Sequence, residues 1–315
     1  MIALVTGHRG FVGRWLVDLL IGKGVEVHGF SAGDDLRGTH DVRDFEQVRR
    51  AVEEAQPDLV FHLAAQAFVS EAAADPHRTH EVNVLGTINV LEAVRRVGPV
   101  GCRVLVAGTS EEYGYSSRHI DEWAPTRPVT IYGASKAGAS HFALAYARQF
   151  GMPVVVTRAF NHTGPGQSPV YAVSSFARRL ALIEDGQLQV LEHGPLDAWR
   201  DFLDVRDVVR AYWDAVRADA GEPGVYNVCS GITRSMREIL DELIDVGGVP
   251  YPTKQVDTGH RAQTPVRFEA VSRLPVTTGW GPEISLRSTL TDLLNYWRER
   301  EQGDHRLSEL RVNRD

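Results

Sequence analysis

Tyr132 and Lys136 form the arrangement in this sequence that points most directly to proton transfer. Four residues apart on a helix, a phenol and an ammonium group lie on the same face. A free phenol has a pKa near ~10, and a neighbouring cation lowers that pKa because it favours the phenolate. Lysine occurs elsewhere only at Lys23 and Lys254 in a chain rich in arginine, which favours a specific role for Lys136.

A polar segment, residues 108–114 (GTSEEYG), follows a predicted strand over residues 103–107. In open α/β sheets, ligands bind beyond the carboxyl ends of the strands, which is where this segment falls. The hydroxyl of Thr109 can hydrogen-bond a sugar hydroxyl or keto oxygen, and the carboxylate of Glu111 can act as a base. The predicted catalytic residues are therefore Thr109, Glu111, Tyr132 and Lys136, and the predicted substrate contacts in this segment are Thr109, Ser110 and Glu111.

Three glycines, Gly7, Gly10 and Gly13, stand between the first predicted strand and the helix that follows it. Glycines at this spacing allow a tight turn, a close approach of the backbone to a pyrophosphate, and close packing of the helix on the sheet. The N-terminus of the helix also attracts an anion. Their place directly after the N-terminal strand predicts a dinucleotide site, with contacts from Gly7, Arg9, Gly10, Phe11, Val12 and Gly13.

The end of the second predicted strand, residues 30–33, bears on the choice of dinucleotide. An acidic residue there would accept a hydrogen bond from a free ribose hydroxyl and repel a 2′-phosphate, and this strand ends without one. Arg9 and Arg37 can pair with that phosphate, so we expect NADP(H). Asp34 and Asp35 keep NAD(H) as the alternative. Along this stretch the predicted cofactor contacts are Ser31, Arg37, Asp41 and Val42, the last two beside the adenine after a very short third strand.

Alternating strands and helices must position these residues. Continuous apolar runs separated by helical patterns are typical of a parallel sheet that is covered on both faces. The strands are predicted over residues 2–6, 25–30, 59–63, 103–107 and 154–156, and the helices over residues 11–20, 44–55, 80–97 and after Tyr132. The sequence therefore predicts an α/β fold, a Rossmann-type doubly wound parallel sheet.

The second half of the chain has a different pattern. After about Asn161, Gly-Pro and Ser-Pro pairs interrupt shorter elements, which is typical of a smaller, loop-rich C-terminal domain. A helical pattern over residues 205–216 and a strand pattern over residues 224–228 indicate that the chain returns to the first sheet. We therefore expect a dinucleotide-binding domain over residues 1–160 with a return segment near 203–230, a substrate domain over residues 161–300 and a frayed polar tail over residues 301–315.

The composition argues against several other classes of protein. The chain has 315 residues with 34 basic and 41 acidic side chains, so it lacks the basic field of a nucleic-acid-binding protein. Cys102 and Cys229 lie far apart without metal-ligand spacing, which argues against a disulfide framework and against a metal site. We find no signal sequence and no apolar run long enough to span a bilayer, so we expect a cytoplasmic protein that binds no membrane.

Together these groups of residues resemble the extended short-chain dehydrogenase/reductase family over nearly the whole chain. The likeness includes HLAA at residues 62–65 and NVLGT at residues 83–87. It implies that Thr109, Tyr132 and Lys136 form the catalytic set, and that Lys136 binds the nicotinamide ribose and lowers the pKa of Tyr132. It also implies cofactor contacts at Leu63, Ala64 and Ala65.

Three further motifs resemble the branch of that family that acts on GDP-sugars: FNHTGPGQ at residues 160–167, RDFLDVRD at residues 200–207 and YNVCSG at residues 226–231. They are most similar to GDP-6-deoxy-4-ketomannose reductases, which form GDP-rhamnose, and next to GDP-mannose 4,6-dehydratases. The likeness implies that Thr109 and Tyr132 hold the C4 oxygen of the sugar. The other implied substrate contacts are Asn161 and Arg200 at the diphosphate, Arg178 near the guanine or its ribose, and Arg261 at a phosphate.

Within this branch, the reductase and the dehydratase differ in the role of Glu111. A dehydratase oxidises C4, removes the C5 proton with a carboxylate, loses water from C6 and returns the hydride to C6, whereas a reductase delivers hydride to a C4 ketone and a proton from Tyr132. Thr-Ser-Glu at residues 109–111 is the dehydratase pattern, but the chain length and residues 278–280 resemble the reductases. We therefore predict an NADPH-dependent 4-reductase, with a dehydratase, a bifunctional enzyme and another nucleotide-sugar epimerase or dehydratase as alternatives.

A non-catalytic, dinucleotide-binding sensor is the alternative from a different class. The intact set of Thr109, Tyr132 and Lys136 argues against it, because a sensor does not need a tuned phenol. The predicted helices near residues 80–97 and 132–150 carry apolar residues on more than one face, and the family commonly pairs these helices. We therefore expect a homodimer or a higher homo-oligomer.

Overall fold

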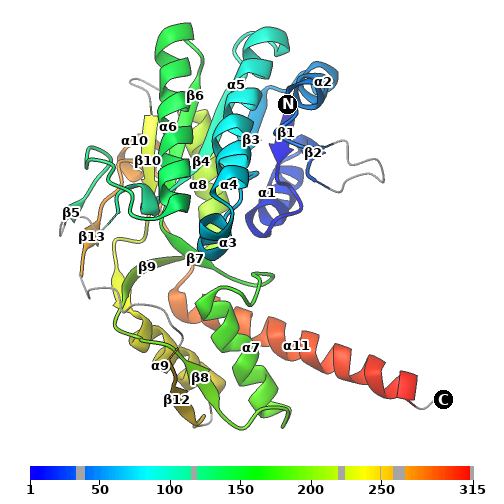
Figure 1. Cartoon of the computed structure of the whole chain (residues 1–315), viewed down its shortest axis with the longest axis vertical. Coiled ribbons are helices and arrows are strands. Elements are labelled where there is room, and N and C mark those ends of the chain that lie inside the picture. The colour runs from blue at the N-terminus through cyan, green and yellow to red at the C-terminus, as the bar shows by residue number, and fades with distance from the viewer. Residues whose placement is uncertain (33–39, 115–118, 219–223, 249, 258–266, 313–315) are drawn as a thin grey trace.

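A six-stranded parallel sheet forms the centre of the molecule (Figure 1). The computed structural model describes residues 1–32, 40–114, 119–218, 224–248, 250–257 and 267–312, with side chains up to residue 302. In chain order the strands are β1 (Ile2–Thr6), β2 (Glu26–Phe30), β3 (Leu59–His62), β4 (Arg103–Thr109), β6 (Val154–Ala159) and β10 (Gly224–Val228). All neighbouring strands pair in parallel, which confirms the predicted α/β fold.

The strand order β10-β6-β4-β3-β1-β2 places the start of the chain inside the sheet. From β1 the chain adds β2 on one side and then crosses to β3, β4, β6 and β10 on the other. The reversal between β1 and β3 is the point at which a doubly wound sheet opens a crevice for ligands. β3 pairs directly with β1. The very short third strand predicted before Asp41 falls on residues 33–39, which lie outside the described residues.

Helices cover both faces of the sheet (Figure 1). They are α1 (Phe11–Gly22) and α8 (Val205–Arg217) on one face, and α2 (Phe45–Ala55), α5 (Gly86–Val97) and α6 (Ile131–Phe150) on the other. Leu16 and Tyr212 belong to the buried cluster under the first pair, and Val52 and Val90 to the cluster under the second group. Each large apolar side chain buried in this way contributes about 1.5–3 kcal/mol, so the two clusters hold the strand ends in place.

A second, smaller group of elements lies beyond the carboxyl ends of the central strands (Figure 1). It contains α7 (Ala172–Glu184), α9 (Met236–Gly247) and α11 (Leu286–Val312), which share a buried cluster, and five short strands: β7 (Asn161–Thr163), β8 (Leu191–His193), β9 (Trp199–Asp204), β11 (Thr233–Ser235) and β12 (Thr253–Gln255). Between these elements, α8 and β10 return the chain to the central sheet, where β10 pairs with β6. This group therefore forms one wall of the crevice.

Shorter elements connect the two groups. They are α3 (Val69–Ala74), α4 (Pro76–His80), the π-helical turn η1 (Glu81–Leu85), the 3₁₀ turn η2 (Ser110–Glu112), β5 (His119–Ile120), β13 (Glu269–Ala270) and α10 (Leu274–Thr278). The η1 turn continues directly into α5, so the helix predicted near residues 80–97 is interrupted by one wider turn. β5 pairs with β13 and joins the loop after β4 to the loop before α10.

The charged C-terminus differs from the frayed tail that the sequence predicted. α11 runs to Val312, so residues 301–312 are helical. Glu301 is 8% exposed, and its carboxylate accepts a hydrogen bond of 2.8 Å from Arg178 Nε. This contact with α7 holds the beginning of the segment in place. It could not be predicted from sequence, because the tail has no apolar periodicity.

Among the described residues, we find no helix that is both long and apolar enough to cross a membrane. The same part of the chain holds no cluster of three or more histidine, cysteine or acidic side chains that could bind a metal ion. Cys102 and Cys229 are both buried free thiols.

Candidate active site

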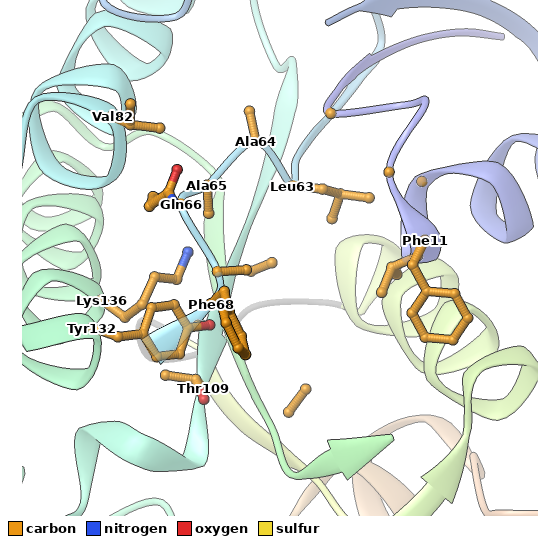
Figure 2. A pocket seen from close by; sticks show the side chains of 18 of the residues that line it. Phe11, Leu63, Ala64, Ala65, Gln66, Phe68, Val82, Thr109, Tyr132 and Lys136 are labelled. Carbon is orange, nitrogen blue, oxygen red and sulfur yellow. The ribbon is translucent and has the colours of Figure 1, made fainter. Parts of the chain in front are cut away.

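A cavity of about 810 Å³ opens at the carboxyl ends of β1, β3, β4 and β6. Its lining runs from the glycine loop after β1, past the residues that follow β3 and β4, to the first turns of α6 and the segment 159–162 after β6. Figure 2 shows part of this lining, with Phe11 on the far side from Tyr132 and Lys136 and the residues after β3 between them. The fold thus brings the sequence motifs from four separate strand ends to one cavity.

The glycine loop fits a dinucleotide pyrophosphate. Gly7 has a φ of 75°, and a Cβ there would lie 2.8 Å from the Ala64 backbone nitrogen. A Cβ on Gly13 would lie 2.2 Å from the Gly7 carbonyl oxygen, so only glycine lets α1 pack this closely on the loop. Gly10 is the N-cap of α1 and makes no side-chain capping bond, so the helix N-terminus faces the cavity with its own N–H groups. All six predicted loop contacts line the cavity: Gly7, Arg9, Gly10, Phe11, Val12 and Gly13.

The end of β2 supplies a polar corner beside that loop. Ser31 Oγ lies 3.0 Å from His8 Nδ1 and accepts a hydrogen bond of 3.3 Å from the Arg9 backbone N–H. The His8 ring lies over Gly29, where a Cβ would meet the ring at 2.5 Å. Arg9 and Ser31 both line the cavity, whereas Arg37, Asp34 and Asp35 lie outside the described residues. Among the described residues, the end of β2 and the glycine loop therefore place the cation of Arg9 and the hydroxyl of Ser31 at the cavity, and residues 26–32 place no acidic side chain there.

Asp41 and Val42 line the cavity, as does Arg43, which the sequence did not single out. Arg43 Nε donates to both carboxylate oxygens of Asp41, at 3.0 and 2.9 Å, and its Nη1 donates to Glu81 at 3.3 Å. The hydrogen bonds from Arg43 hold the pKa of Asp41 below its usual value. The carboxylate predicted to meet the adenine is thus fixed by an arginine two residues further along the chain.

Leu63, Ala64 and Ala65 line the cavity between the glycine loop and α6 (Figure 2). The strand before them ends at His62, which is buried and contacts Thr6 at 2.8 Å and Thr87 at 3.0 Å. Burial lowers the pKa of His62 to about 3, and the Lys136 charge acts in the same direction. A neutral histidine therefore ties β1 to α5 beneath the cavity.

Tyr132 and Lys136 extend from the first turns of α6 toward the cavity, with Thr109 below Tyr132 (Figure 2). Thr130 caps this helix, because its hydroxyl oxygen accepts a hydrogen bond of 2.9 Å from the Gly133 N–H. Lys136 is 3% exposed, and the Thr109 side chain hydrogen-bonds the Tyr132 phenol. The predicted catalytic group Thr109, Tyr132 and Lys136 is therefore assembled at one wall of the cavity.

Burial controls the acidity of both groups on α6. It raises the pKa of Tyr132 above its usual range, with Tyr171 acting in the same direction and the Thr109 hydrogen bond acting against it. Burial also lowers the pKa of Lys136 to about 8, while the Glu112 carboxylate opposes that change. Burial thus acts on the Tyr132 pKa in the direction opposite to the lowering by Lys136 expected from the family resemblance, and that lowering stays a prediction.

Glu111 lines the cavity beside Thr109. Its backbone N–H donates to the Thr109 hydroxyl oxygen at 3.3 Å, and its carboxylate accepts a hydrogen bond of 3.4 Å from the Thr130 hydroxyl. A Cβ on Gly133 would lie 2.6 Å from the Glu111 carbonyl oxygen, so this turn packs directly against the start of α6. The sequence-predicted base and Ser110 both lie at the cavity wall that carries Tyr132.

Several aromatic and imidazole side chains complete the cavity and were missed from sequence: Phe68, His162, Tyr171 and Tyr212. The His162 ring is nearly parallel to Phe11, with ring centroids 6.2 Å apart, and its Nδ1 lies 2.9 Å from the Phe160 carbonyl oxygen. Since a carbonyl can only accept, Nδ1 carries the proton and burial keeps the ring neutral by lowering its pKa. His162 follows Asn161 in its motif, which is the one signal that could have singled it out.

Of the predicted substrate contacts, Asn161 lines the cavity together with the segment 109–111. Arg178 lies outside the lining, donates to Glu301 and stacks over Trp297 at 5.6 Å. Arg200 also lies outside the lining, and its Nη1 donates to the Trp199 carbonyl oxygen at 2.7 Å. Arg261 lies outside the described residues. The roles of these three arginines stay predictions.

The family model described as GDP-mannose 4,6 dehydratase matches residues 4–276, which include every described residue of the cavity. The chain belongs to this family. The resemblance to the GDP-sugar branch of the extended short-chain dehydrogenases/reductases, inferred from its motifs, is thereby confirmed.

The similar proteins include a GDP-6-deoxy-D-mannose reductase and a GDP-mannose 4,6-dehydratase. This family member is 38% identical over 250 residues to a GDP-6-deoxy-D-mannose reductase of Pseudomonas aeruginosa, covering 78% of this chain and 81% of the relative. It is 30% identical over 346 residues to a GDP-mannose 4,6-dehydratase of Vibrio cholerae, covering 93% and 92%. Among solved structures, it resembles RMD from Pseudomonas aeruginosa complexed with NADPH, with a TM-score of 0.84 and 34% identity over 95% of this chain and 99% of the other.

Proposed function

We propose that this protein reduces the C4 ketone of GDP-4-keto-6-deoxymannose to form GDP-rhamnose. The observation that carries the proposal is a buried phenol, Tyr132, hydrogen-bonded to Thr109 at the wall of a cavity whose opposite end is a dinucleotide-type glycine loop. Support comes from the 38% identity to a GDP-6-deoxy-D-mannose reductase. NADPH, bound at the loop, supplies the hydride that reduces the ketone.

The chain's own residues supply the proton and the orientation. The Thr109 hydroxyl oxygen accepts from the Glu111 N–H and its side chain hydrogen-bonds Tyr132, so we propose that its hydrogen turns from the phenol to the ketone oxygen when substrate binds. Tyr132, whose pKa is raised by burial, carries its proton at neutral pH and transfers it to the same oxygen as that oxygen becomes an alkoxide. Lys136, buried beside it, contributes a positive charge that stabilises the developing anion. A protonated phenol suits reduction, whereas a dehydratase must begin by removing a proton from a C4 hydroxyl.

A preference for NADPH over NADH belongs to the same proposal. Arg9 and Ser31 border the cavity where a 2′-phosphate would lie, and β2 ends without an acidic residue in the described part of the chain. A solved structure similar to this chain is complexed with NADPH. Equal use of NADH would contradict this part of the proposal and leave the reduction itself intact.

GDP-mannose 4,6-dehydration is the second candidate, and Glu111 is the observation that favours it. Its carboxylate is held by Thr130 at the cavity wall that carries Thr109 and Tyr132, where a base for the C5 proton would be needed. The Vibrio cholerae relative supports this reading. If dehydration occurs, Glu111 is the proposed C5 base, and reduction of the ketosugar by the same protein would make the enzyme bifunctional.

The sugar nucleotide is proposed to bind between the two groups of elements, within residues 161–300 on one side and the cavity on the other. Asn161 and the segment 109–111 are the proposed substrate contacts that line the cavity. Arg178, Arg200 and Arg261 are retained as proposed contacts with the nucleotide. Alanine variants of the three, tested for a raised KM for the sugar nucleotide at unchanged kcat, would decide each role.

Self-association is proposed through α5 and α6. Phe142 and Phe150 are each 44% exposed on α6, and Leu85 is 41% exposed just before α5, which leaves apolar surface on that side of the sheet. A second copy of the chain would cover it, as the family commonly does. Light scattering coupled to gel filtration should give the mass of a dimer or a higher oligomer.

We also propose a cytoplasmic location, which cell fractionation would test.

The deciding experiment incubates the purified protein with GDP-mannose, and separately with GDP-4-keto-6-deoxymannose and NADPH, and identifies the products by mass spectrometry. NADPH consumption with the ketosugar, and unchanged GDP-mannose, is the result expected for the reductase. Loss of one water from GDP-mannose would establish the dehydratase. Tight NADPH binding without turnover of any nucleotide sugar would overturn the enzyme proposal and favour a sensor.

A further inference from the structure

Glu112, the residue after the predicted base, is fully buried beneath the catalytic residues with an exposure of 0%. One of its carboxylate oxygens accepts hydrogen bonds from the Thr109 backbone N–H at 3.0 Å and from the Ser140 hydroxyl at 2.9 Å. The other accepts from Arg158 Nε at 2.8 Å. Burial raises the pKa of Glu112, and the charge of Arg158 and the hydrogen bonds act against that change. The Thr109 N–H and the Arg158 guanidinium can only donate, so both favour the ionised carboxylate.

These contacts join three elements that carry the active site. Thr109 ends β4, Ser140 lies on α6 and Arg158 lies on β6. Thr109 and Glu112 form a reciprocal capping box around the η2 turn, so the Glu112 side chain fixes the backbone of Thr109. Ser140 stands four residues after Lys136 and therefore on the same face of α6. One carboxylate thus sets the distance between Thr109 and the helix that carries Tyr132 and Lys136.

The space for this carboxylate is built into the strand before it. A Cβ on Gly108 would lie 2.5 Å from Glu112 Oε1 and 2.9 Å from the Thr157 carbonyl oxygen. Only glycine at position 108 leaves room for the Glu112 side chain to pass under β4. The glycine that opens the polar segment in the sequence is therefore explained by Glu112 and not by the ligand cavity alone.

Arg158 compensates the buried charge and is itself held on a second side. Its side chain is 5% exposed, its Nη1 donates to the Tyr113 hydroxyl at 3.1 Å, and its guanidinium stacks on the Tyr113 ring at 4.8 Å. Tyr113 in turn donates to Asn227 Oδ1 on β10 at 2.7 Å. A buried pair with this many partners is costly to break from one side, because the remaining charge is left without compensation.

We propose that Glu112 is a positioning residue that holds Thr109 against the catalytic helix and keeps the ammonium group of Lys136 charged. The ionisable groups that face this region from the neighbouring elements are His62 on β3, Arg158 on β6 and Tyr113 after η2. His62 is neutral and Arg158 is positive, so Glu112 is the negative charge that opposes the lowering of the Lys136 pKa to about 8. The kinetic part of this proposal rests on the proposed function, and the electrostatic part does not.

The test uses the fact that lysine occurs only at Lys23, Lys136 and Lys254. With ¹³C label at the lysine Cε, three resonances are followed by NMR against pH, and the Lys136→Met variant assigns one of them. We expect Lys136 to titrate near pH 8, and Glu112→Gln to move that midpoint down by about one pH unit. An unchanged Lys136 midpoint in folded Glu112→Gln would overturn the electrostatic part, and no substrate is needed for this result.

The matched control is Asp207→Asn on α8. Asp207 is also 0% exposed, pairs with Arg210 at 2.7 Å and accepts from the backbone N–H groups of Glu283 and Ile284. It does not line the cavity, so its variant should lose similar stability while the Lys136 titration stays in place. An equal shift in both variants would show that general loosening, and not the Glu112 charge, moves the midpoint.

Glu112→Asp separates the effect of the carboxylate's position from the effect of its charge. It also provides a second test if Glu112→Gln fails to fold. It keeps the carboxylate but is one methylene shorter, so it cannot reach Thr109, Ser140 and Arg158 together. We expect a tenfold or larger loss of kcat for ketosugar reduction with NADPH affinity within about threefold of the parent, and a Lys136 midpoint near pH 8. A kcat equal to that of the parent enzyme would overturn the positioning role. Absence of turnover in the parent itself would count against the proposed function alone.

Discussion

The two ends of the cavity are built from different kinds of chemical group. At the glycine loop, contiguous residues present backbone N–H groups at the N-terminus of α1, and the requirement at Gly7 and Gly13 is the absence of a side chain. At the catalytic end, Thr109, Tyr132 and Lys136 are side chains whose acidity and position depend on burial and on distant partners. We therefore expect the first end to change little with pH between 7 and 9, and the second end to be sensitive to pH.

Gly13→Ala should cause the largest effect, because it disrupts the packing of α1 on the glycine loop. A Cβ there would meet the Gly7 carbonyl oxygen at 2.2 Å and the His8 Cα at 2.7 Å, so the loop must move off α1. We expect a loss of about 3 kcal/mol or more in the free energy of unfolding and loss of NADPH binding. Thermal unfolding and fluorescence titration measure the two. Gly22→Ala in the same helix is the control and should cause no comparable loss of stability or NADPH binding, because an added Cβ there would meet no other part of the described structure within 4 Å.

Tyr132→Phe should remove the proton donor without disturbing the glycine loop. We expect kcat for ketosugar reduction to fall about a thousandfold while the NADPH dissociation constant stays within about threefold. Stopped-flow absorbance and equilibrium fluorescence separate the two quantities. Tyr146→Phe is the matched change on the same helix, since its hydroxyl donates to Glu92 at 3.2 Å outside the cavity. Similar losses from both variants would contradict a chemical role for Tyr132.

Arg9→Ala tests the charged side chain that the glycine loop contributes to the cavity. If Arg9 pairs with a 2′-phosphate, KM for NADPH should rise about tenfold while KM for NADH stays the same, because NADH lacks that phosphate. Steady-state kinetics with each cofactor gives the ratio. A parallel rise in both KM values would show that Arg9 acts on the shared diphosphate and not on the choice between cofactors.

The pH profile should distinguish the two ends in the unmodified enzyme. Lys136 is charged below its pKa of about 8, so kcat should be flat near pH 7 and fall about tenfold for each pH unit well above 8. His62, with a pKa of about 3, stays neutral throughout and adds no acidic limb. NADPH affinity at the glycine loop should change little from pH 7 to 9. A kcat that rises through pH 9 would contradict the requirement for a charged Lys136.

Asp44→Ala should give the smallest loss of stability, and it shows whether a loss of stability alone changes kcat. Asp44 caps α2, where its carboxylate accepts from the Glu46 N–H at 2.9 Å and the Gln47 N–H at 3.2 Å, away from the catalytic residues. We expect a loss of about 1 kcal/mol, seen as a Tm lower by about 2 °C, with unchanged kcat. A change in kcat here would indicate that stability alone alters turnover, and the kinetic variants above would need correction for it.

Much of the fold was predictable because its signals are local. Apolar runs and helical periodicity placed the central strands of the sheet, and β6 proved longer than the three residues predicted for it, at Val154–Ala159. The position of the strand order reversal and the helical C-terminus were not local properties. They depend on which buried faces meet, as the contact of Arg178 with Glu301, 123 residues apart, illustrates.

The site divides in the same way. The spacing of the glycines and of Tyr132 and Lys136 by itself predicted a glycine loop after β1 and a phenol and an ammonium group on one face of α6, because turn geometry and helix periodicity act over a few residues. Only the tertiary structure decided the charges: it buried Tyr132 and Lys136, and placed Glu112 on Arg158, 46 residues away. Desolvation and ion pairing depend on the atoms that surround a group in space, so no pattern along the chain could have supplied them.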